Sequence, residues 1–350
     1  MTAGVCINLV RSDEYFDFHT LQGAQVKLVS SLRQPMREPG SGSIPIWTAL
    51  FQKSDQVVSR EPGERFLGHL RPAVEEAKTD HEFAWLSVVA YGRSVGDKKK
   101  GLVAWLFDVI PGKSHREVNP NGEAILRDCG WTRWPDFAPE NVLDQMKKSH
   151  LRVEVWTKKE PPCIVAAFGG TVFTSGKDWK SNLRWFLPKH IDEYSQIVDV
   201  FGPAFVVELC RRMRESEWAY LRNATMFSTG HSLGGGLAQQ FAYSLPTNPE
   251  VPRVAQVFAF DPSPVTGFYS VDKALRDNNK SNLRIDRIYE RGEILAIVRS
   301  LMSVLVKPSA KNPSMRGVRY SLFFPADPIR GHSILELASK IEIASSGGSA

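Results

Sequence analysis

The chain has 350 residues, 42% of them hydrophobic, and a formal net charge of +6 at pH 7. This apolar fraction is ordinary for a globular protein with a sizeable core. No dense basic run with interleaved aromatic residues occurs, so the composition argues against a nucleic-acid-binding protein. The sequence contains no run of about 18 apolar residues, so no transmembrane helix is expected.

The first eleven residues have neither the basic start nor the long apolar core of a secretory signal peptide. We therefore expect a cytoplasmic protein, while export without a signal peptide stays open. The cysteines are widely spaced and form no Cys-x-x-Cys pair, which indicates free thiols rather than a disulfide framework or a zinc site. They are Cys6, Cys129, Cys163 and Cys210.

Residues 1–150 predict a mostly helical region that packs on the main domain or completes it. The clearest element in it is a buried helix over residues 80–91, with Asp80 as the N-terminal cap. A second, short helix is expected over residues 124–129. The sequence of this region favours no single role, because it could complete the sheet, cover a site or bind a partner.

From residue 151 the pattern changes to strands that alternate with helices. Residues 151–156 alternate apolar and polar side chains, and residues 163–168 form the continuous apolar run of a strand covered on both faces. This alternation predicts an α/β domain with a mostly parallel central sheet flanked by helices, over residues 151–343, and a disordered tail over residues 344–350. The later elements are strands over 220–227, 254–260, 283–290 and 318–324, a helix over 191–221 with a kink or break at Pro203, and helices over 237–243 and 333–343.

A Gly-x-Ser-x-Gly motif, formed by Gly230, Ser232 and Gly234, lies between an expected strand and an expected helix. A nucleophilic serine on a strained strand-to-helix turn requires this context, because glycines on either side let the turn close and leave the hydroxyl exposed. The N-terminus of the following helix also offers backbone N–H groups to a developing oxyanion. The motif therefore predicts a nucleophile at Ser232.

A serine hydroxyl needs a base to take its proton, and that base is usually a histidine held by a carboxylate. In hydrolases with this turn, the order along the chain is serine, acid, histidine. His332 is the only histidine after Ser232, which makes it the candidate base. Two acids that follow strands compete for the third role, and we weight Glu293 over Asp261. Either acid could instead order a loop or pair with nearby arginines.

The oxyanion of such a reaction needs two backbone N–H donors. One is expected from Leu233, directly after the nucleophile. The other is expected from the loop after the buried strand, which begins with two glycines and Thr171. Glycines there let the backbone approach a substrate closely, and Thr171 can donate through both its amide and its hydroxyl.

Three segments, in order, resemble class 3 lipases, the fungal triacylglycerol lipase-like family of α/β-hydrolases. Residues 164–171 (IVAAFGGT) resemble the family's strand and oxyanion loop. Residues 178–183 (DWKSNL) resemble its Asp-Trp-x-x-Asn-Leu segment, and residues 229–238 (TGHSLGGGLA) are nearly its elbow sequence. The resemblance covers about residues 150–340 and implies an α/β-hydrolase fold.

The resemblance also implies site residues: Ser232 as nucleophile, His332 as base, and Thr171 with Leu233 as the oxyanion hole. Glu293 falls in the segment that carries the family's acid, at a position where the family has aspartate. The chain departs from the family pattern in two other places. An arginine stands in the family where this chain has Gly169, and the family's usual Gly-x-Pro is replaced by residues 261–264 (DPSP).

The function expected from this resemblance is hydrolysis of carboxylic esters of lipids, by a lipase or phospholipase, with no metal and no organic cofactor. The expected partners are the lipid ester and, transiently, a membrane or lipid surface. Residues 185–188 (WFLP) lie where the family carries its lid, and they equally fit a buried helix start. Alternative functions are a small-ester or thioester hydrolase of the same fold and a catalytically inactive lipid-binding module.

Overall fold

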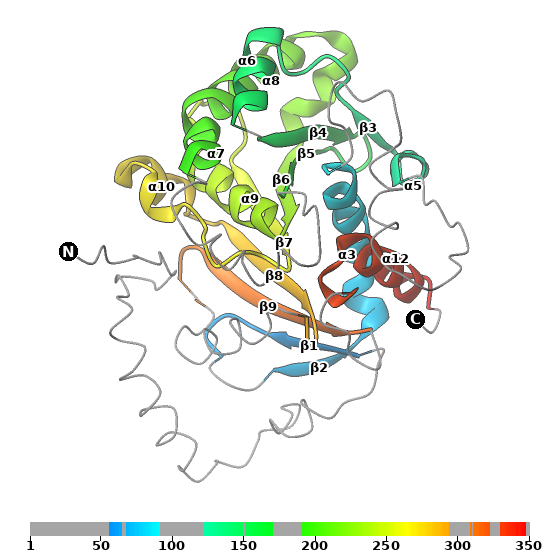
Figure 1. Ribbon diagram of the computed structural model, residues 1–350. Coiled ribbons are helices and arrows are strands. Elements are labelled where there is room, and N and C mark those ends of the chain that lie inside the picture. The colour runs from blue at the N-terminus through cyan, green and yellow to red at the C-terminus, as the bar shows by residue number, and fades with distance from the viewer. Residues whose placement is uncertain are drawn as a thin grey trace, which may run out of the picture.

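A single sheet forms the centre of the computed structural model (Figure 1). Its central strands are parallel, from β5 through β6, β7 and β8 to β9, and the strands outside them at both edges are antiparallel. The described residues are 56–64, 68–91, 122–149, 151–170, 191–293, 309, 311–322 and 330–347. Within them, the strands in spatial order are β2 (His69–Pro72), β1 (Gln56–Arg60), β9 (Ser314–Ser321), β8 (Arg284–Glu290), β7 (Val254–Phe260), β6 (Thr225–His231), β5 (Cys163–Gly169), β4 (Arg152–Lys158) and β3 (Trp131–Arg133).

Helices cover both faces of the sheet, with α3 and α12 side by side on one face and α7, α8 and α9 on the other (Figure 1). This mostly parallel sheet between helical layers confirms the predicted α/β-hydrolase fold class. The helical elements are α3 (Ala73–Val89), α5 (Gly122–Asp128), α6 (Glu140–Lys148), α7 (Ile191–Gln196), η3 (Ile197–Phe201), α8 (Gly202–Arg214), η4 (Ser216–Asn223), α9 (Leu233–Ser244), η5 (Phe268–Ser270), α10 (Lys273–Asn279), η6 (Arg330–His332) and α12 (Ile334–Ser345).

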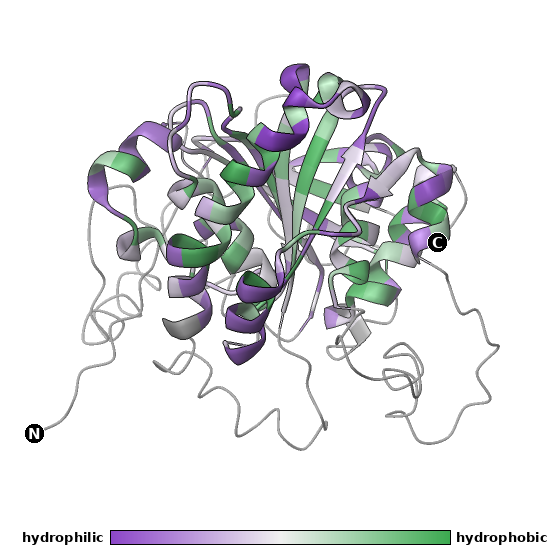
Figure 2. Cartoon of the chain, turned by 90° about the horizontal axis from the view of Figure 1, so that it is seen from above, coloured by the Kyte–Doolittle hydropathy of each residue, from purple (hydrophilic) through white to green (hydrophobic). Residues whose placement is uncertain are grey.

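The position of β5 at the centre of the sheet explains why its sequence is continuously apolar. All its residues are buried. Ile164 and Phe168 pack into the core under α8 and α9, while Val165 and Ala167 pack into the core under α3 and α12. Since successive side chains of a strand point to opposite faces, a strand with helices on both sides needs apolar residues at every position. The hydrophobic colour of Figure 2 is accordingly concentrated on the central strands and on the helix surfaces beside them.

The long helix expected over residues 191–221 is interrupted. The helix α7 passes through a π-helical turn, η3, into α8, and Pro203 lies in the first turn of α8, where a missing N–H is tolerated. The expected kink or break near Pro203 thus corresponds to the π-helical turn just before it, and the helix continues through Pro203 to Arg214. The 3-10 helix η4 follows, so β6 begins at Thr225 and not at residue 220 as the sequence suggests. The strand β9 likewise begins at Ser314, earlier than the expected residue 318.

Asp80 does not cap the helix in which it lies. The helix α3 begins at Ala73, directly after Pro72, so the predicted helix start at Asp80 is wrong. Residues 73–79 (AVEEAKT), most of them good helix formers, make up the first two turns of the helix. Asp80 is fully buried and accepts a hydrogen bond from the hydroxyl of Tyr320 on β9 at 2.7 Å. Burial raises the pKa of Asp80 to about 8.

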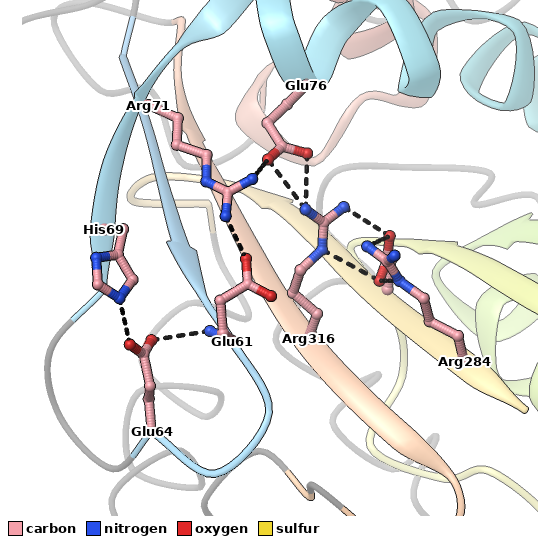
Figure 3. Close-up of polar contacts among 8 residues, drawn as sticks. Glu61, Glu64, His69, Arg71, Glu76, Arg284 and Arg316 are labelled. Atoms are coloured by element: carbon pink, nitrogen blue, oxygen red, sulfur yellow. Dashed lines mark hydrogen bonds and ion pairs between the residues drawn. The ribbon is translucent and has the colours of Figure 1, made fainter. Parts of the chain in front are cut away.

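A network of ion pairs joins the β1–β2 hairpin and α3 to β8 and β9 (Figure 3). Arg316 of β9 donates to Oδ2 of Asp286 on β8 at 2.7 Å and to Oε1 of Glu76 on α3 at 3.0 Å, and all three side chains are buried. Arg71 of β2 also donates to Glu76, at 3.1 Å, and to Glu61, at 2.7 Å. Because removing one partner would leave a buried charge uncompensated, the network holds these elements in one arrangement.

Three strands come from the region before residue 151, where the sequence predicts none: β1 and β2 at one edge of the sheet and β3 at the other. The boundary at residue 150 stays a prediction. At the other end, α12 continues through Ser345, and residues 348–350 lie outside the described part. None of the helices in the described ranges is long and apolar enough to cross a membrane.

Candidate active site

The candidate residues gather at the edge where the parallel strands end. Ser232 directly follows β6, and Asp261 directly follows β7. Glu293 lies three residues after β8, and His332 ends the short turn η6, after β9 and before α12. Since the carboxyl ends of parallel strands share one edge of a sheet, residues far apart along the chain converge there, as the sequence predicts.

Ser232 has the backbone conformation of a strained turn. Its φ is 55° and its ψ is −120°, a region that costs a non-glycine residue about 1–3 kcal/mol. Neighbouring backbone groups hold it there. Its N–H donates to the carbonyl of Phe260 at 2.9 Å, and its carbonyl accepts from Gly235 at 3.1 Å and from Ser263 at 2.9 Å. The serine is half-buried, between the end of β6 and the start of α9.

The two glycines of the motif are required by close backbone contacts. A Cβ atom on Gly230 would lie 2.3 Å from the carbonyl oxygen of Gly234. One on Gly234 would lie 2.3 Å from the carbonyl oxygen of Phe168 at the end of β5. Real side chains do not approach backbone atoms so closely. The glycines therefore bring the first turn of α9 against the loop that leaves β5.

His332 lies against Glu293. The Nδ1 atom of His332 is 2.9 Å from Oε2 of Glu293, and both side chains are buried. Because an ionised carboxylate only accepts, a neutral imidazole in this contact has its proton on Nδ1 and its lone pair on Nε2. Gly331 makes room for this pair, because a Cβ atom there would meet Cβ of Glu293 at 3.2 Å. Glu293 thus holds the imidazole of His332 in one orientation.

Asp261 contacts a different histidine. Its Oδ1 accepts from the backbone N–H of Glu290 at 3.3 Å, and its Oδ2 lies 3.9 Å from Nε2 of His231. Its backbone has φ 40°, a left-handed conformation, and it is fully buried. Of the two acids that the sequence leaves in competition, Glu293 lies within hydrogen-bonding distance of His332, and Asp261 faces His231.

Two further residues, His231 and Tyr91, lie at the site, although the sequence does not identify them as candidate site residues. The hydroxyl of Tyr91 lies 2.8 Å from Nδ1 of His231 and 3.1 Å from the carbonyl oxygen of the same residue. The rings of His231 and His332 are 4.8 Å apart between centroids. Tyr91 precedes His231 by 140 residues and lies just after α3, so no local pattern could have linked the two. Burial raises the pKa of Tyr91, so its hydroxyl keeps its proton.

Of the two predicted oxyanion donors, Leu233 lies among the described residues. It is the first residue of α9, so its N–H belongs to the N-terminal group of amides that have no partner within that helix. Gly170, the first residue after β5, lies against the turn that carries Ser232, because a Cβ atom on it would be 2.9 Å from the carbonyl oxygen of His231. Thr171, the other predicted donor, and the candidate lid at residues 185–188 lie outside the described residues.

Two groups of side chains in the described ranges have donor atoms close enough to hold a metal ion. One, of His231, Asp261 and His332, is buried and belongs to this site. The other, of residues 81, 82 and 129 (a histidine, a glutamate and a cysteine), is half-buried near the start of β3. The arrangement at the strand ends can support attack by a serine hydroxyl with a histidine as base.

Comparisons with known proteins yield only distant structural likenesses. No family model matches the chain, and no curated protein matches it. Lipase II from Rhizopus niveus aligns at 15% identity, with a TM-score of 0.38, over 80% of this chain and 95% of that one. The Rhizomucor miehei lipase in complex with its propeptide aligns at 13% identity, with a TM-score of 0.36, over 75% of this chain and 72% of that one. At these values the likeness carries no argument about activity.

Proposed function

We propose that the protein is a serine hydrolase that cleaves carboxylic esters of lipids through Ser232, His332 and Glu293. The observation that carries this proposal is the 2.9 Å contact between Nδ1 of His332 and Oε2 of Glu293, at the strand edge that also holds Ser232 in its strained turn. The ring of His332 packs on that of His231, the residue directly before the serine. This contact supports a position of the base near the nucleophile.

The reaction follows the usual course of an acyl transfer. The Oγ atom of Ser232 attacks the ester carbonyl carbon, and its proton passes to Nε2 of His332, whose positive charge Glu293 stabilises. The N–H of Leu233 and the donors of Thr171 hold the oxyanion. Collapse of this intermediate expels the alcohol, which takes the proton from His332. Water then gives a proton to His332 and attacks the acyl-enzyme, and the acid leaves as Ser232 regains its proton.

The lipid character of the substrate rests on the sequence resemblance to class 3 lipases. The elbow sequence over residues 229–238 and the DWKSNL segment over residues 178–183 support it. In this proposal the protein contacts a membrane or lipid surface transiently while it takes up its substrate. The triad itself does not choose the alcohol that leaves, so acyl-chain length is the property to measure.

Hydrolysis of p-nitrophenyl esters with short and with long acyl chains tests the proposal. Ser232→Ala is expected to lose at least about 10³-fold in kcat, because the nucleophile is gone. Ser339→Ala is the matched control: this serine lies on α12 and donates to the carbonyl of Leu335 at 2.8 Å, so the change should leave activity intact. Covalent labelling by a fluorophosphonate, present in wild type and lost in Ser232→Ala, identifies the nucleophile independently of the ester.

The outcomes separate the alternatives. Faster hydrolysis of long-chain esters supports a lipid substrate, whereas a clear preference for short chains favours a small-ester hydrolase. Folded wild-type protein that hydrolyses none of these esters and is not labelled contradicts the proposal and favours an inactive lipid-binding module.

A further inference from the structure

We propose that Tyr91 is a positioning residue, whose hydroxyl bridges the turn that carries Ser232 and the loop that leaves β5 and so fixes their spacing. These are the two segments from which the oxyanion donors are predicted to come. The bridge follows from the contacts of Tyr91 alone, whereas its effect on catalysis rests on the proposed function. It also gives the region before residue 151 a role at the site, which the sequence leaves open.

One end of the bridge is the turn that carries Ser232. The hydroxyl of Tyr91 donates to the carbonyl oxygen of His231 at 3.1 Å and lies 2.8 Å from Nδ1 of the same residue. Both side chains are buried. His231 directly precedes Ser232, and its ring also faces Asp261 at 3.9 Å. Because one hydroxyl contacts both the backbone and the ring of His231, Tyr91 fixes the residue from which the strained turn begins.

The other end of the bridge is the loop that leaves β5. A Cβ atom on Gly170 would lie 2.3 Å from the hydroxyl oxygen of Tyr91, so this hydroxyl fills the space beside Gly170. Burial raises the pKa of Tyr91, and a hydrogen bond from the backbone of Gly170 partly offsets that rise. Gly170 directly precedes Thr171, the predicted second oxyanion donor. The hydroxyl therefore contacts the residue before Thr171 and the residue before Ser232.

The end of α3 is held in place on both neighbouring strands. A Cβ atom on Gly169, the last residue of β5, would lie 2.5 Å from the carbonyl oxygen of Ala90. One turn before Tyr91, the hydroxyl of Ser87 lies 2.9 Å from that of Thr229 on β6. Residues four apart lie on the same face of a helix, so Tyr91 extends the row of contacts that Ser87 makes with β6. The hydroxyl of Tyr91 is thus presented from a fixed support.

The spacing of the two segments matters because the predicted donors act on one oxygen atom. Hydrogen-bond donors stabilise an oxyanion when they lie about 2.7–3.1 Å from it. Leu233 and Thr171 follow different strands, so their separation depends on what joins the two strand ends. Displacement of such a group by about 1 Å can lower the rate about 100-fold. A hydroxyl that contacts both segments limits this displacement.

Tyr91→Phe removes the hydroxyl and keeps the ring, so it tests the bridge with little change in packing. The p-nitrophenyl ester that wild type hydrolyses fastest serves as the substrate. The expected result is a fall in kcat of about 10- to 100-fold with KM within about threefold of wild type, because the lost interaction positions groups for the transition state. Labelling by a fluorophosphonate should slow by a similar factor.

Ser87→Ala is the matched control, because it removes a buried hydroxyl from the same helix. The Ser87 hydroxyl donates to the carbonyl of Phe83 at 3.0 Å and contacts Thr229, but it touches neither segment of the bridge. Both variants should unfold a few degrees below wild type on heating, while only Tyr91→Phe loses kcat. Equal losses of kcat in the two variants, or wild-type kcat in Tyr91→Phe, overturn the positioning role.

Hydrogen exchange followed by mass spectrometry tests the bridge without any substrate. The peptide that contains Gly170 should exchange about tenfold faster in Tyr91→Phe than in wild type, and at the wild-type rate in Ser87→Ala. Unchanged exchange in Tyr91→Phe overturns the bridge. If wild type neither hydrolyses the esters nor is labelled, the proposed hydrolase function fails, while exchange at Gly170 still decides whether Tyr91 joins the two segments.

Discussion

The Nδ1 atom of His332 and the Oε2 atom of Glu293 lie 2.9 Å apart, although 39 residues separate them along the chain. The competing acid, Asp261, lies at the end of the neighbouring strand and faces His231 at 3.9 Å. Two carboxylates at the same edge of the sheet therefore have different partners. The difference arises because the two carboxylates follow different strands and their side chains point in different directions.

This difference predicts unequal effects of removing the two acids. Glu293→Gln is expected to lower kcat about 10²- to 10⁴-fold, because an amide can neither hold the Nδ1–H tautomer nor stabilise the imidazolium. Asp261→Asn, the matched control, is expected to lose less than tenfold, since its carboxylate faces His231 at 3.9 Å. Ester hydrolysis by the two purified variants, in the presence of a chelator, provides the comparison. A larger loss in Asp261→Asn would assign the acid to Asp261.

Gly234, the second glycine of the Gly-x-Ser-x-Gly motif, allows a test of the tight strand-to-helix turn around Ser232. Alanine is normally about 1 kcal/mol better than glycine inside a helix. At Gly234, however, the new Cβ atom would lie 2.3 Å from the carbonyl oxygen of Phe168, a backbone atom that cannot move away cheaply. Gly234→Ala is therefore expected to lower the free energy of unfolding by about 1–3 kcal/mol, measured by urea denaturation, and to lower activity.

Gly317 is the control for that substitution. A Cβ atom there would have its nearest neighbour, Cβ of Arg60, at 3.9 Å, which is an ordinary contact. Gly317→Ala should change the free energy of unfolding by less than about 1 kcal/mol, and in the stabilising direction. Equal destabilisation by both alanines would mean that the tight contact at Gly234 does not exist in solution.

Asp80 predicts a pH dependence of stability. Burial raises its pKa to about 8 in the folded protein, against about 3.9 in an unfolded chain. The folded state thus holds a proton that the unfolded state releases above about pH 4. The resulting contribution to stability is full below about pH 4 and is lost progressively as the pH rises toward 8.

Asp80→Asn has no such proton to lose, and its amide oxygen can still accept from Tyr320. Relative to wild type, the variant should gain stability on the order of 2–4 kcal/mol between about pH 5 and pH 8, measured by urea unfolding at both pH values. Asp277→Asn is the control. Hydrogen bonds from Lys273 and Lys280 lower the pKa of Asp277 to about 2, so its contribution is lost only as the pH falls below about 4. If wild type and Asp80→Asn differed by the same free energy at both pH values, the raised pKa would be contradicted.

The sequence by itself determined those parts of the fold that short-range patterns encode. Such patterns, which depend on residues within one or two turns of each other, predicted the apolar run of β5, the alternation of strands and helices, and the strand–turn–helix around Ser232. Helix starts and strand ends were less well predicted, as at Asp80 and at Thr225. At such boundaries tertiary packing outweighs local preference.

Only the tertiary structure decided which distant side chains meet. The choice between Glu293 and Asp261 depends on the order β7–β8–β9 and on the path of η6, and the contact of Tyr91 with His231 depends on α3 lying beside β6. Three strands from before residue 151 escaped prediction for a related reason: edge strands are short, and they become regular through pairing with a sheet formed elsewhere in the chain. Contacts between residues far apart in the sequence produce no periodic pattern of side chains in either segment, so sequence periodicity does not predict them.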